Sequence, residues 1–360
     1  MQVRNNGVNK IRDHFFVLLS GVISFWIIFH PMLYDKHGRV INYMRLAVTD
    51  RCNLRCFYCM PEAGINYVDK SELMTYEEML RITRVFVKQG ISKVRITGGE
   101  PFIRKDMMAF LEAISEIPGL DKIRLTTNGT LISHHLPKLL ALGISEINLS
   151  LDSLDRQRFF DITRRDDFPK VMSCLEQMMA LGIHVKINMV VMRGRNDEDI
   201  LPMVELTKNK KITVRFIEEM PFNGTDGQGN EGFLSYVKIM QIIREKYATV
   251  SKLKDPLYST SQNYKVEGYL GDFGIIAAYS RTFCGSCNRI RLTPQGTIKT
   301  CLYDNGVFNV KNMLRAGASD TQVTEALQSA LANKPKDGFE AENNRILQAP
   351  VSESMSTIGG

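Results

Sequence analysis

From Val40 onward, short runs of aliphatic and β-branched residues alternate with longer runs in which apolar positions recur every three or four residues. This alternation is typical of parallel strands that are connected by helices. The predicted strands cover residues 40–48, 93–97, 121–126, 146–151, 183–191 and 212–218. Six such units predict an α/β fold, an incomplete (βα)6 barrel of the TIM type, with a C-terminal extension.

One predicted helix has a clear beginning. Thr75 and Glu78 have the spacing of a capping box, and the apolar positions that follow fall on one helix face: Met79, Ile82, Val85 and Phe86. That face is expected to pack against the sheet. In barrels of this kind, functional residues lie at the carboxyl ends of the strands, so the loops after the strands are where chemistry is expected.

Residues 1–31 differ from the rest of the chain. Fifteen uncharged residues run from Phe15 to Phe29, fewer than the roughly 20 that a membrane-spanning helix needs. No small-residue cleavage site follows them, so secretion is not expected. We interpret 1–31 as a dispensable extension or a misassigned start ahead of Met32, with a weak anchor as the alternative. The remaining divisions are a partial barrel over 32–255, a C-terminal region over 256–345 and a tail over 346–360.

Composition fits a large folded enzyme. The chain has 360 residues, of which 44% are hydrophobic and 24% charged, which excludes a disordered protein. The formal net charge of +7 is modest for this length and does not indicate nucleic acid, because such an excess usually lies on a solvated surface. We expect no nucleic-acid partner.

Three cysteines, Cys52, Cys56 and Cys59, follow the first predicted strand in the stretch TDRCNLRCFYCMPE. A cubane iron–sulfur cluster has four irons that each need a terminal ligand, so three thiolates leave one iron open to a small molecule. Zinc is the alternative. Structural zinc requires four donors, and the nearest histidines in the sequence are His37 and His134, so the cluster is favoured.

A second set of three, Cys284, Cys287 and Cys301, lies in FCGSCNRIRLTPQGTIKTC. Two incomplete sets indicate two clusters, each with an open iron. A disulfide or one zinc shared between the sets are the alternatives; the number of thiols and the absence of a secretory signal favour a reducing compartment. The seventh cysteine, Cys174, lies in an apolar helical run and is predicted to be a core residue.

The loop TGGEP, from Thr97 to Pro101, follows the second predicted strand. Two glycines allow close approach of the backbone to a ligand, and Glu100 could accept hydrogen bonds from an ammonium group. Gly-Gly after a strand is also common in plain turns, so the loop is informative only because it comes after the strand that follows the cysteine loop.

The cysteine spacing, with Tyr58 just before the third cysteine, resembles the radical S-adenosylmethionine (SAM) superfamily. Six separated segments in the same order resemble one family within it, molybdenum cofactor biosynthesis protein A, the GTP 3′,8-cyclases. The segments are YMRLAVTDRCNLRCFYCMPE, VRITGGEPFIRKD, LTTNGTLI, INLSLDSL, FCGSCNRIRLTPQGTIKTCL and the terminal IGG. The resemblance covers residues from about 40 to 360.

The resemblance implies roles for individual positions. The cluster ligands would be the two cysteine triplets. SAM would be bound by Tyr58, Gly99, Glu100, Ser150 and Met220. GTP would be bound by Arg45, Arg95, Thr126, Lys186, Arg289, Ile290 and Arg291. The residues with an implied catalytic role are Arg289, Arg291, Gly359 and Gly360, the last two reaching into the barrel beside the substrate.

The implied cations also carry an argument of their own. An arginine in a strand can simply pair with a neighbouring carboxylate, so a single arginine is weak evidence for an anion-binding site. Several around one barrel mouth repel one another and favour a polyanion, and the guanidinium fork suits phosphate.

The implied function is the conversion of GTP to (8S)-3′,8-cyclo-7,8-dihydroguanosine 5′-triphosphate, the first step of molybdopterin biosynthesis. The implied cofactors are two [4Fe–4S] clusters and SAM, the implied partners are GTP and a flavodoxin- or ferredoxin-like electron donor, and a cytoplasmic homodimer is expected. Two other functions stay open. A radical SAM peptide-modifying enzyme usually has more cysteines than the three after residue 280, and a non-catalytic metal-binding module would not need the TGGEP loop.

Overall fold

The computed structural model describes residues 32–60, 67–220, 233–346 and 355–358. The interpretation of residues 1–31 therefore lies outside the described part of the chain. Within that part, no helix is both long and apolar enough to cross a membrane.

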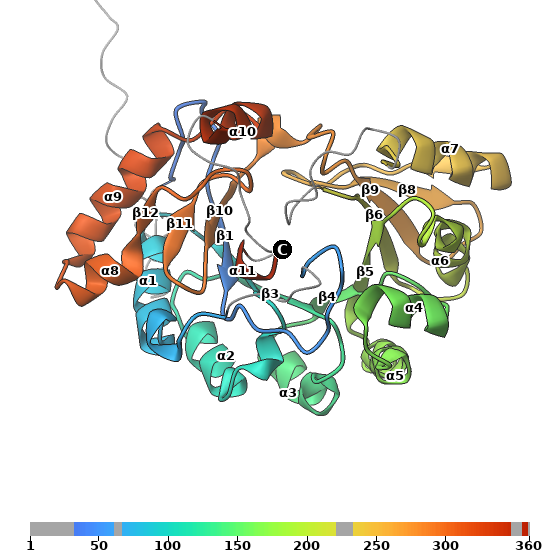
Figure 1. Cartoon of the computed structure of the whole chain (residues 1–360), viewed down its shortest axis with the longest axis horizontal. Helices are drawn as coiled ribbons and strands as arrows, with labels where there is room; N and C mark the ends of the chain where they lie inside the picture. Colours follow the sequence, from blue (N-terminus) through green and yellow to red (C-terminus); the bar gives the residue numbers. More distant parts are fainter. Residues whose placement is uncertain (1–31, 61–66, 221–232, 347–354, 359–360) are drawn as a thin grey trace, which may run out of the picture.

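All six predicted strands are present and pair in sequence order as parallel neighbours. Their bounds are β1 Tyr43–Ala47, β2 Lys93–Thr97, β3 Lys122–Thr127, β4 Glu146–Ser150, β5 His184–Val191 and β6 Thr213–Glu218. The six strands curve around a common interior without closing on themselves (Figure 1). The prediction of an incomplete barrel is confirmed.

The C-terminal region extends the same sheet at both edges. Its strands are β7 Val250–Lys252, β8 Gln262–Val266, β9 Asp272–Ile276, β10 Arg289–Leu292, β11 Thr297–Lys299 and β12 Phe308–Asn309. β10 lies parallel to β1 and carries β11 and β12, whereas β9 lies parallel to β6 and carries β8 and β7. The sheet continues across residue 255, so the division there stays a prediction.

Helices cover the outer face of the sheet (Figure 1). The longer ones are α1 Tyr76–Lys88, α2 Met107–Ser115, α3 Leu136–Ala141, α4 Arg156–Thr163, α5 Phe168–Ala180, α6 Ile200–Leu206, α7 Tyr236–Lys246, α8 Val310–Arg315, α9 Asp320–Ala332 and α10 Gly338–Ile346. One short helix, α11 Met355–Ile358, lies instead within the ring of strands.

The capping box of α1 is confirmed. Glu78 N–H donates to the Thr75 hydroxyl at 3.2 Å, and Thr75 N–H donates to the Glu78 carboxylate at 2.8 Å. The predicted apolar face, Met79, Ile82, Val85 and Phe86, is buried in the main core. Cys174 is buried there as well, as predicted.

Alternation along the strands separates two environments. In β1, Met44 and Leu46 are fully buried in the core shared with the helices, whereas Tyr43 and Arg45 line the interior of the barrel. Because successive side chains of a strand point to opposite faces, a strand with an apolar outer face can carry charge inside. The interior is therefore a place where buried charge must be accounted for.

Candidate active site

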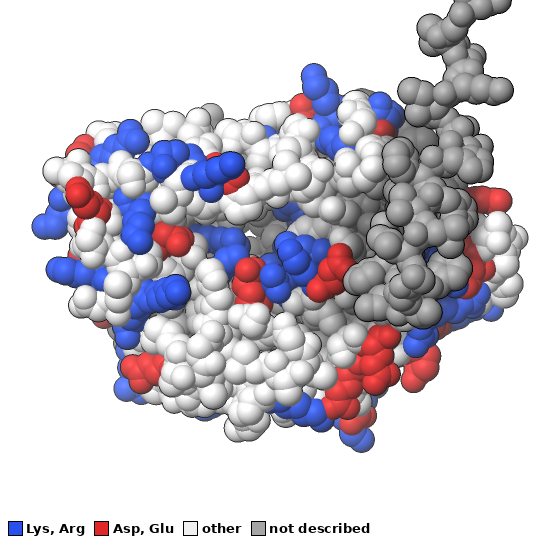
Figure 2. Space-filling view, turned by 180° about the vertical axis from the view of Figure 1, so that it is seen from behind, with Lys and Arg blue, Asp and Glu red and all other residues white. Residues whose placement is uncertain are grey.

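A cavity of about 600 Å³ occupies the interior of the curved sheet. Seen from the side opposite to that of Figure 1, acidic and basic side chains gather around a hollow in the middle of the molecule (Figure 2). The cavity is lined at one end by the three cysteines that follow β1 and along its wall by cations from several strands. This size suits a ligand with the bulk of a nucleotide or a cofactor.

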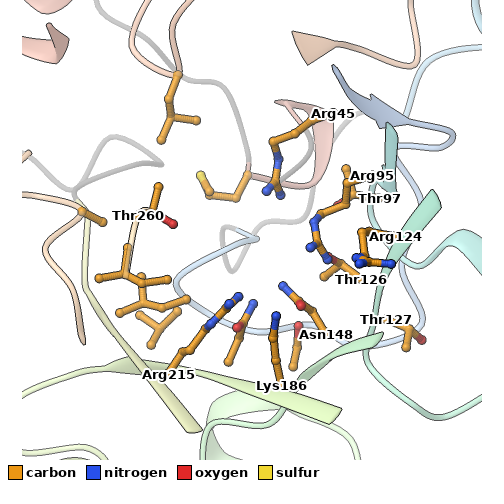
Figure 3. A pocket seen from close by; sticks show the side chains of 18 of the residues that line it. Arg45, Arg95, Thr97, Arg124, Thr126, Thr127, Asn148, Lys186, Arg215 and Thr260 are labelled. Atoms are coloured by element: carbon orange, nitrogen blue, oxygen red, sulfur yellow. The ribbon is translucent and has the colours of Figure 1, made fainter. Parts of the chain in front are cut away.

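Nine cationic side chains from six strands line this cavity. They are Arg45, Lys93, Arg95, Lys122, Arg124, Lys186, Arg215, Arg289 and Arg291. The side chains of Arg45, Arg95, Arg124, Lys186 and Arg215 point into one common space (Figure 3). We call this set of nine the basic wall.

The structure brings most of the predicted GTP contacts together. Arg45, Arg95, Thr126, Lys186, Arg289 and Arg291 all line the cavity. Ile290 does not belong to the described lining; its side chain is fully buried in the main core. Since it stands between two inward arginines of β10, its side chain must point to the other face.

Sequence reasoning missed four members of the basic wall: Lys93, Lys122, Arg124 and Arg215. The signal was the strand period. Lys93 lies two positions before Arg95, and Arg124 lies two before Thr126, so each shares the face of a residue already predicted to point inward. Alternation along β2 and β3 would have found Lys93, Lys122 and Arg124, whereas β6, which carries Arg215, had no residue that was predicted to point inward.

One carboxylate, Glu146 at the start of β4, offsets part of the basic wall. Its oxygens lie 2.8 Å from Lys186 Nζ, 3.2 Å from Arg124 Nε and 4.0 Å from Arg95 Nη2. Burial alone would raise the pKa of Glu146, but the hydrogen bond from Lys186 and the charges of Lys186 and the two arginines lower it to about 2. Glu146 is therefore ionised at every physiological pH.

The cations of the basic wall also lower one another's pKa values. Burial, together with the charge of Arg215, lowers the pKa of Lys186 to about 8, and burial with Arg95 nearby lowers the pKa of Arg215 to about 10. Burial and the neighbouring Arg289 likewise lower the pKa of Arg291 to about 10. Positive charge is thus concentrated beyond what Glu146 balances, and an anionic ligand would relieve it.

Tyr43 responds to the same field. Arg95 Nε donates to the Tyr43 hydroxyl at 2.7 Å, and Lys93 Nζ lies 4.4 Å from the centre of the ring. Burial would raise the pKa of this phenol, but the charges of Arg95, Arg45 and Lys93 lower it to about 7. The Tyr43 hydroxyl holds the Arg95 side chain in place, and its lowered pKa reflects the positive potential of the cavity.

Replacing Glu146 with glutamine should destabilise the metal-free protein at pH 7. Because the folded-state pKa of Glu146 lies below its ordinary value of 4.5, its stabilising effect is present above about pH 4.5 and is lost as the pH falls toward 2. We expect the free energy of unfolding to fall by about 1–3 kcal/mol at pH 7. This is less than for a fully buried ion pair, because the site is partly open to solvent.

The measurement is the melting temperature of both proteins from pH 7 down to pH 3.5. The difference between them should shrink as the pH falls. Glu198→Gln is the control, because Glu198 also pairs with an arginine, Arg158, but its side chain is 82% exposed. A difference for Glu146→Gln that does not depend on pH would contradict the assignment.

The cysteine loop and the TGGEP loop pack backbone against backbone. Gly99 N–H donates to Thr49 O and Glu100 N–H donates to Arg51 O, both at 2.8 Å. A Cβ atom at Gly98, where φ is +140°, would lie 2.4 Å from Thr49 O, and one at Gly99 would lie 2.1 Å from Arg51 O. The two glycines are required because only a bare backbone can approach the cysteine loop this closely.

Glu100 is fully buried, and its carboxylate already has partners. It accepts from the Thr127 hydroxyl at 2.9 Å and from Asn128 N–H at 2.7 Å. Burial raises its pKa to about 7 despite these hydrogen bonds. Glu100 is not part of the described cavity lining, whereas Gly99 is, so its contact with an ammonium group stays a prediction.

The other predicted SAM contacts, Tyr58, Ser150 and Met220, all line the cavity. The Tyr58 hydroxyl donates to Asp152 at 2.7 Å, and Val190 N–H donates to the other Asp152 oxygen at 2.9 Å. Burial raises the pKa of Asp152 to about 6, although both hydrogen bonds oppose this. Asp152, which sequence reasoning did not single out, fixes the tyrosine beside the cysteines.

Unpaired polar atoms in the cavity indicate that it is built for a polar ligand. Asn148 Oδ1, Asn188 Oδ1 and Arg215 Nε are buried and have no hydrogen-bond partner among the described residues. All three side chains line the cavity. Buried polar groups of this kind usually have a partner, and a ligand rich in oxygens and nitrogens would supply it.

The first triplet fits a cluster site. Cys52, Cys56 and Cys59 carry free thiols and converge on the cavity. Burial and the negative charge of Glu100 raise the pKa of Cys52 to about 11, and burial also raises the pKa of Cys56. Without metal these groups stay protonated, so metal must displace their protons for the thiolates to form.

The second triplet also converges but stands behind the cavity wall. Cys287 is close enough to influence both Cys284 and Cys301 electrostatically. None of the three belongs to the described cavity lining, which is formed there by Phe283, Asn288 and Leu302. Burial would raise the pKa of Cys287, but the charges of Lys334 and Arg289 lower it to about 7.

Helix α11 contributes to the cavity lining through Met355, and its Ile358 belongs to an apolar cluster that Cys301 also contacts. Ile358 is 2% exposed and forms a small apolar cluster with Tyr303 and Ala341, against which Cys301 and Met355 pack. Arg291 Nη1 donates to Ile358 O at 3.4 Å. Gly359 and Gly360 lie outside the described residues, but the residue before them is anchored to the basic wall.

Within the described ranges, no group of three His, Cys, Asp or Glu side chains is arranged to hold a single metal ion. Ligands of one zinc ion all lie within about 2.3 Å of it, whereas the thiolates of a cubane bind different irons and stand farther apart. Among the described residues, neither cysteine triplet has the close arrangement that one zinc ion requires.

Models of two protein families match the chain. The radical SAM superfamily matches residues 46–207, and the family described as Molybdenum Cofactor Synthesis C matches residues 212–340. The boundary between the two matches falls just before β6. Together they include all six cysteines of the two triplets.

Curated relatives extend this result. The GTP 3′,8-cyclase of Syntrophomonas wolfei is 41% identical over 332 residues, which cover 91% of this chain and 99% of that protein. The mitochondrial GTP 3′,8-cyclase of Arabidopsis thaliana is 37% identical, with coverage of 84% and 78%. Molybdenum cofactor biosynthesis protein moc-5 of Caenorhabditis elegans is 40% identical over 92% of this chain. The chain spans 55% of that protein and about half of several other eukaryotic relatives.

Solved structures show the same fold. Streptococcus suis SuiB bound to S-adenosylmethionine superposes with a TM-score of 0.58 at 16% identity, covering 90% of this chain and 78% of that one. The enzyme anSMEcpe with AdoMet and a peptide superposes with a TM-score of 0.53 at 16% identity, covering 81% of each chain. At such identities the likeness concerns the fold alone.

Proposed function

Because this chain belongs to the GTP 3′,8-cyclase family of the radical SAM superfamily, we propose that it converts GTP to (8S)-3′,8-cyclo-7,8-dihydroguanosine 5′-triphosphate for molybdenum cofactor biosynthesis. One observation carries the proposal: a single cavity has three free cysteines at one end and the basic wall along its side. The cysteines suit a cluster with an open iron, and the wall suits a triphosphate.

The basic wall would bind and orient the nucleotide. Arginines supply paired donors to phosphate oxygens, and Tyr43 keeps the Arg95 guanidinium aligned toward the cavity. Glu146 keeps Lys186 and Arg124 in defined positions before the anion arrives. An aligned set of cations loses little freedom on binding, which improves both affinity and the placement of the ribose.

The cysteine end would hold the radical chemistry. Cys52, Cys56 and Cys59 would carry one [4Fe–4S] cluster, and Cys284, Cys287 and Cys301 a second. Tyr58, Gly99, Ser150 and Met220 would contact SAM, since all four line the same cavity as the first triplet. When bound, the first cluster would pass one electron from the external donor to SAM, and the organic radical released from SAM would take a hydrogen atom from C3′ of the ribose.

The residues that line the cavity would then hold the ribose close to the guanine, so that the ribose radical reacts with the base. C3′ must reach C8 of guanine to form the new bond, and the product forms after uptake of one electron and one proton. The enclosing sheet, with its apolar outer layer and helices, limits access of water to the interior.

We also propose an electron donor, a compartment and an oligomeric state for this protein. An external donor of the flavodoxin or ferredoxin class would supply electrons, and we expect a cytoplasmic homodimer, following the family resemblance. The reducing environment of that compartment fits seven cysteines that are all free in the structure.

A peptide-modifying radical SAM enzyme is the second candidate. Solved structures that share the fold include anSMEcpe bound to AdoMet and a peptide, and Streptococcus suis SuiB bound to the precursor peptide SuiA. The basic wall argues for the nucleotide, because nine cations in one cavity would repel one another around an uncharged peptide.

The test is anaerobic reconstitution with iron and sulfide, followed by incubation with SAM, a reductant and GTP. 5′-Deoxyadenosine should accumulate in step with the cyclised nucleotide, and omission of GTP should stop the coupled product. Stimulation by a peptide library and none by GTP would overturn the assignment. Iron content separates both enzymes from a zinc module: two cubane clusters require about eight irons per chain.

Replacing Arg289 with alanine should weaken GTP binding by about 1.5–3 kcal/mol, or roughly tenfold to a hundredfold, as for loss of one charge-assisted contact. Replacing Arg291 should have at least this effect, because its guanidinium also donates a hydrogen bond to the main-chain carbonyl of Ile358 in α11. Both variants should keep their full iron content.

Titration of GTP into the reconstituted variants measures this. Arg156→Ala is the matched control, because that arginine forms an exposed ion pair with Asp166 on the outside of the barrel. Affinity that is unchanged in both Arg289→Ala and Arg291→Ala would show that these two arginines are structural.

A further inference from the structure

Lys334 lies between α9 and α10, and it is one of the most deeply buried lysines of the structure, with an exposed fraction of 2%. Its ammonium group donates to the main-chain carbonyl oxygens of Thr300 and Arg289, the latter at 3.1 Å. Its third contact is Cys287 Sγ at 3.9 Å, within reach of an N–H···S hydrogen bond.

A buried ammonium needs compensation for its lost hydration. Among the described residues, Lys334 forms no ion pair with a carboxylate, and its partners are two neutral carbonyls and one sulfur. Neutral carbonyls solvate a charge but do not neutralise it. The thiolates of the second triplet are the nearby groups that would.

The contacts of Lys334 also join the chain segments that carry the cysteines. Thr300 immediately precedes Cys301, and Arg289 follows Cys287 by two residues. The third cysteine is tied to the same place by Arg39, whose guanidinium donates to Cys284 O at 3.0 Å and to Pro335 O at 2.7 Å. All three ligand positions are thereby fastened to the segment around Lys334.

We propose that Lys334 is a positioning residue of the second cluster site, which holds Cys287 and the Cys301 segment in place and raises the reduction potential of the cluster bound there. This inference rests on the proposed function, which places a cluster on Cys284, Cys287 and Cys301. Hydrogen bonds to the sulfurs and nearby charge set the potential of such clusters. Reduction adds one negative charge, which a buried cation stabilises.

The test uses the full chain with Cys52, Cys56 and Cys59 all changed to alanine, so that bound iron reports on the second triplet alone. In this background we compare native Lys334 with Lys334→Met, Lys334→Gln and Lys334→Arg. The readouts are iron content, the midpoint potential from an EPR-monitored redox titration, and the melting temperature of the metal-free protein.

Methionine and glutamine remove the charge, whereas arginine keeps it, and glutamine still offers donors to the carbonyl oxygens. The midpoint potential should fall with methionine and with glutamine and stay near the native value with arginine. If the neutral variants melt normally without metal but load no iron, the positioning role is supported. A neutral variant that loads about four irons at an unchanged potential overturns the inference.

Failure of the premise is seen separately. If the background protein with native Lys334 binds no iron at the second triplet, the two-cluster proposal fails and this inference fails with it. If that protein binds about four irons and the neutral variants match its potential, only the role of Lys334 is wrong. Should methionine prevent folding, the comparison between glutamine and arginine decides.

Discussion

Replacing Cys56 with alanine is expected to abolish SAM cleavage completely. Cys56 lines the cavity and lies close enough to both Cys52 and Cys59 for these cysteines to influence its pKa. A cubane left with two protein ligands is no longer held in a defined position or orientation. The same loss is expected for Cys52→Ala and Cys59→Ala, measured as 5′-deoxyadenosine formed under reducing, anaerobic conditions.

Alanine at Cys284, Cys287 or Cys301 should have a different effect. These cysteines do not belong to the described cavity lining, which is formed next to them in the sequence by Phe283, Asn288 and Leu302. We expect residual SAM cleavage that is uncoupled from substrate, together with loss of the cyclised nucleotide. SAM cleavage retained equally in both sets of variants would contradict this division of roles.

Cys174→Ala is the matched control. Cys174 is fully buried beside Gly129 in the main core and takes no part in either triplet. Its replacement should leave iron content and SAM cleavage unchanged and lower the melting temperature slightly, because it removes one buried sulfur. Loss of iron from this variant would show that cysteine replacement acts through general destabilisation.

The barrel strands could be predicted because one physical pattern determined them. Helices cover the outer face of the sheet, so the residues of each strand that point outward are apolar. In β2 these are Val94 and Ile96, which are fully buried. The start of α1 was equally clear, because the Thr75 and Glu78 side chains satisfy backbone groups locally. Neither prediction depended on contacts distant in the sequence.

The C-terminal strands could not be placed in the same way. β10 is only four residues long, and so short a strand is a weak local pattern. Its position is fixed by pairing with β1, more than 200 residues earlier in the chain, with Arg289 opposite Tyr43 and Arg291 opposite Arg45. That register places two further cations on the basic wall and is decided by tertiary structure.

The site shows the same limit. The sequence indicated the cysteines and several arginines, but the neutralising role of Glu146 depends on three strands meeting at one carboxylate. The predicted reason for the glycines of the TGGEP loop was also incomplete. The glycines were expected to allow a ligand to approach the backbone. The structure shows that they allow the backbone of the cysteine loop to pack directly against the TGGEP loop. Close backbone contacts between distant loops leave no local signature.

Deleting Gly359 and Gly360 is expected to stop formation of the cyclised nucleotide while leaving iron content, SAM binding and GTP binding nearly unchanged. Terminal glycines are usually frayed and without function. Here the preceding residue is anchored: Ile358 is buried against Tyr303 and Ala341, and its carbonyl accepts from Arg291. The chain beyond Ile358 therefore starts within the barrel, next to a predicted substrate contact.

A second variant distinguishes the effect of the length of the tail from the effect of its backbone flexibility. Changing Gly359 and Gly360 together to alanine keeps the length of the tail but restricts its backbone angles, so it should also lose most product if a narrow path beside the substrate requires glycine. Mass spectrometry of the nucleotide products measures both variants against the native chain, with iron content and GTP affinity determined on the same preparations. Full product yield from the shortened chain would show that the tail has no part in the reaction, whereas loss in the deletion alone would assign the effect to length. Because Ile358 remains in both variants, the anchor of α11 is preserved, and a fall in product can be attributed to the two glycines.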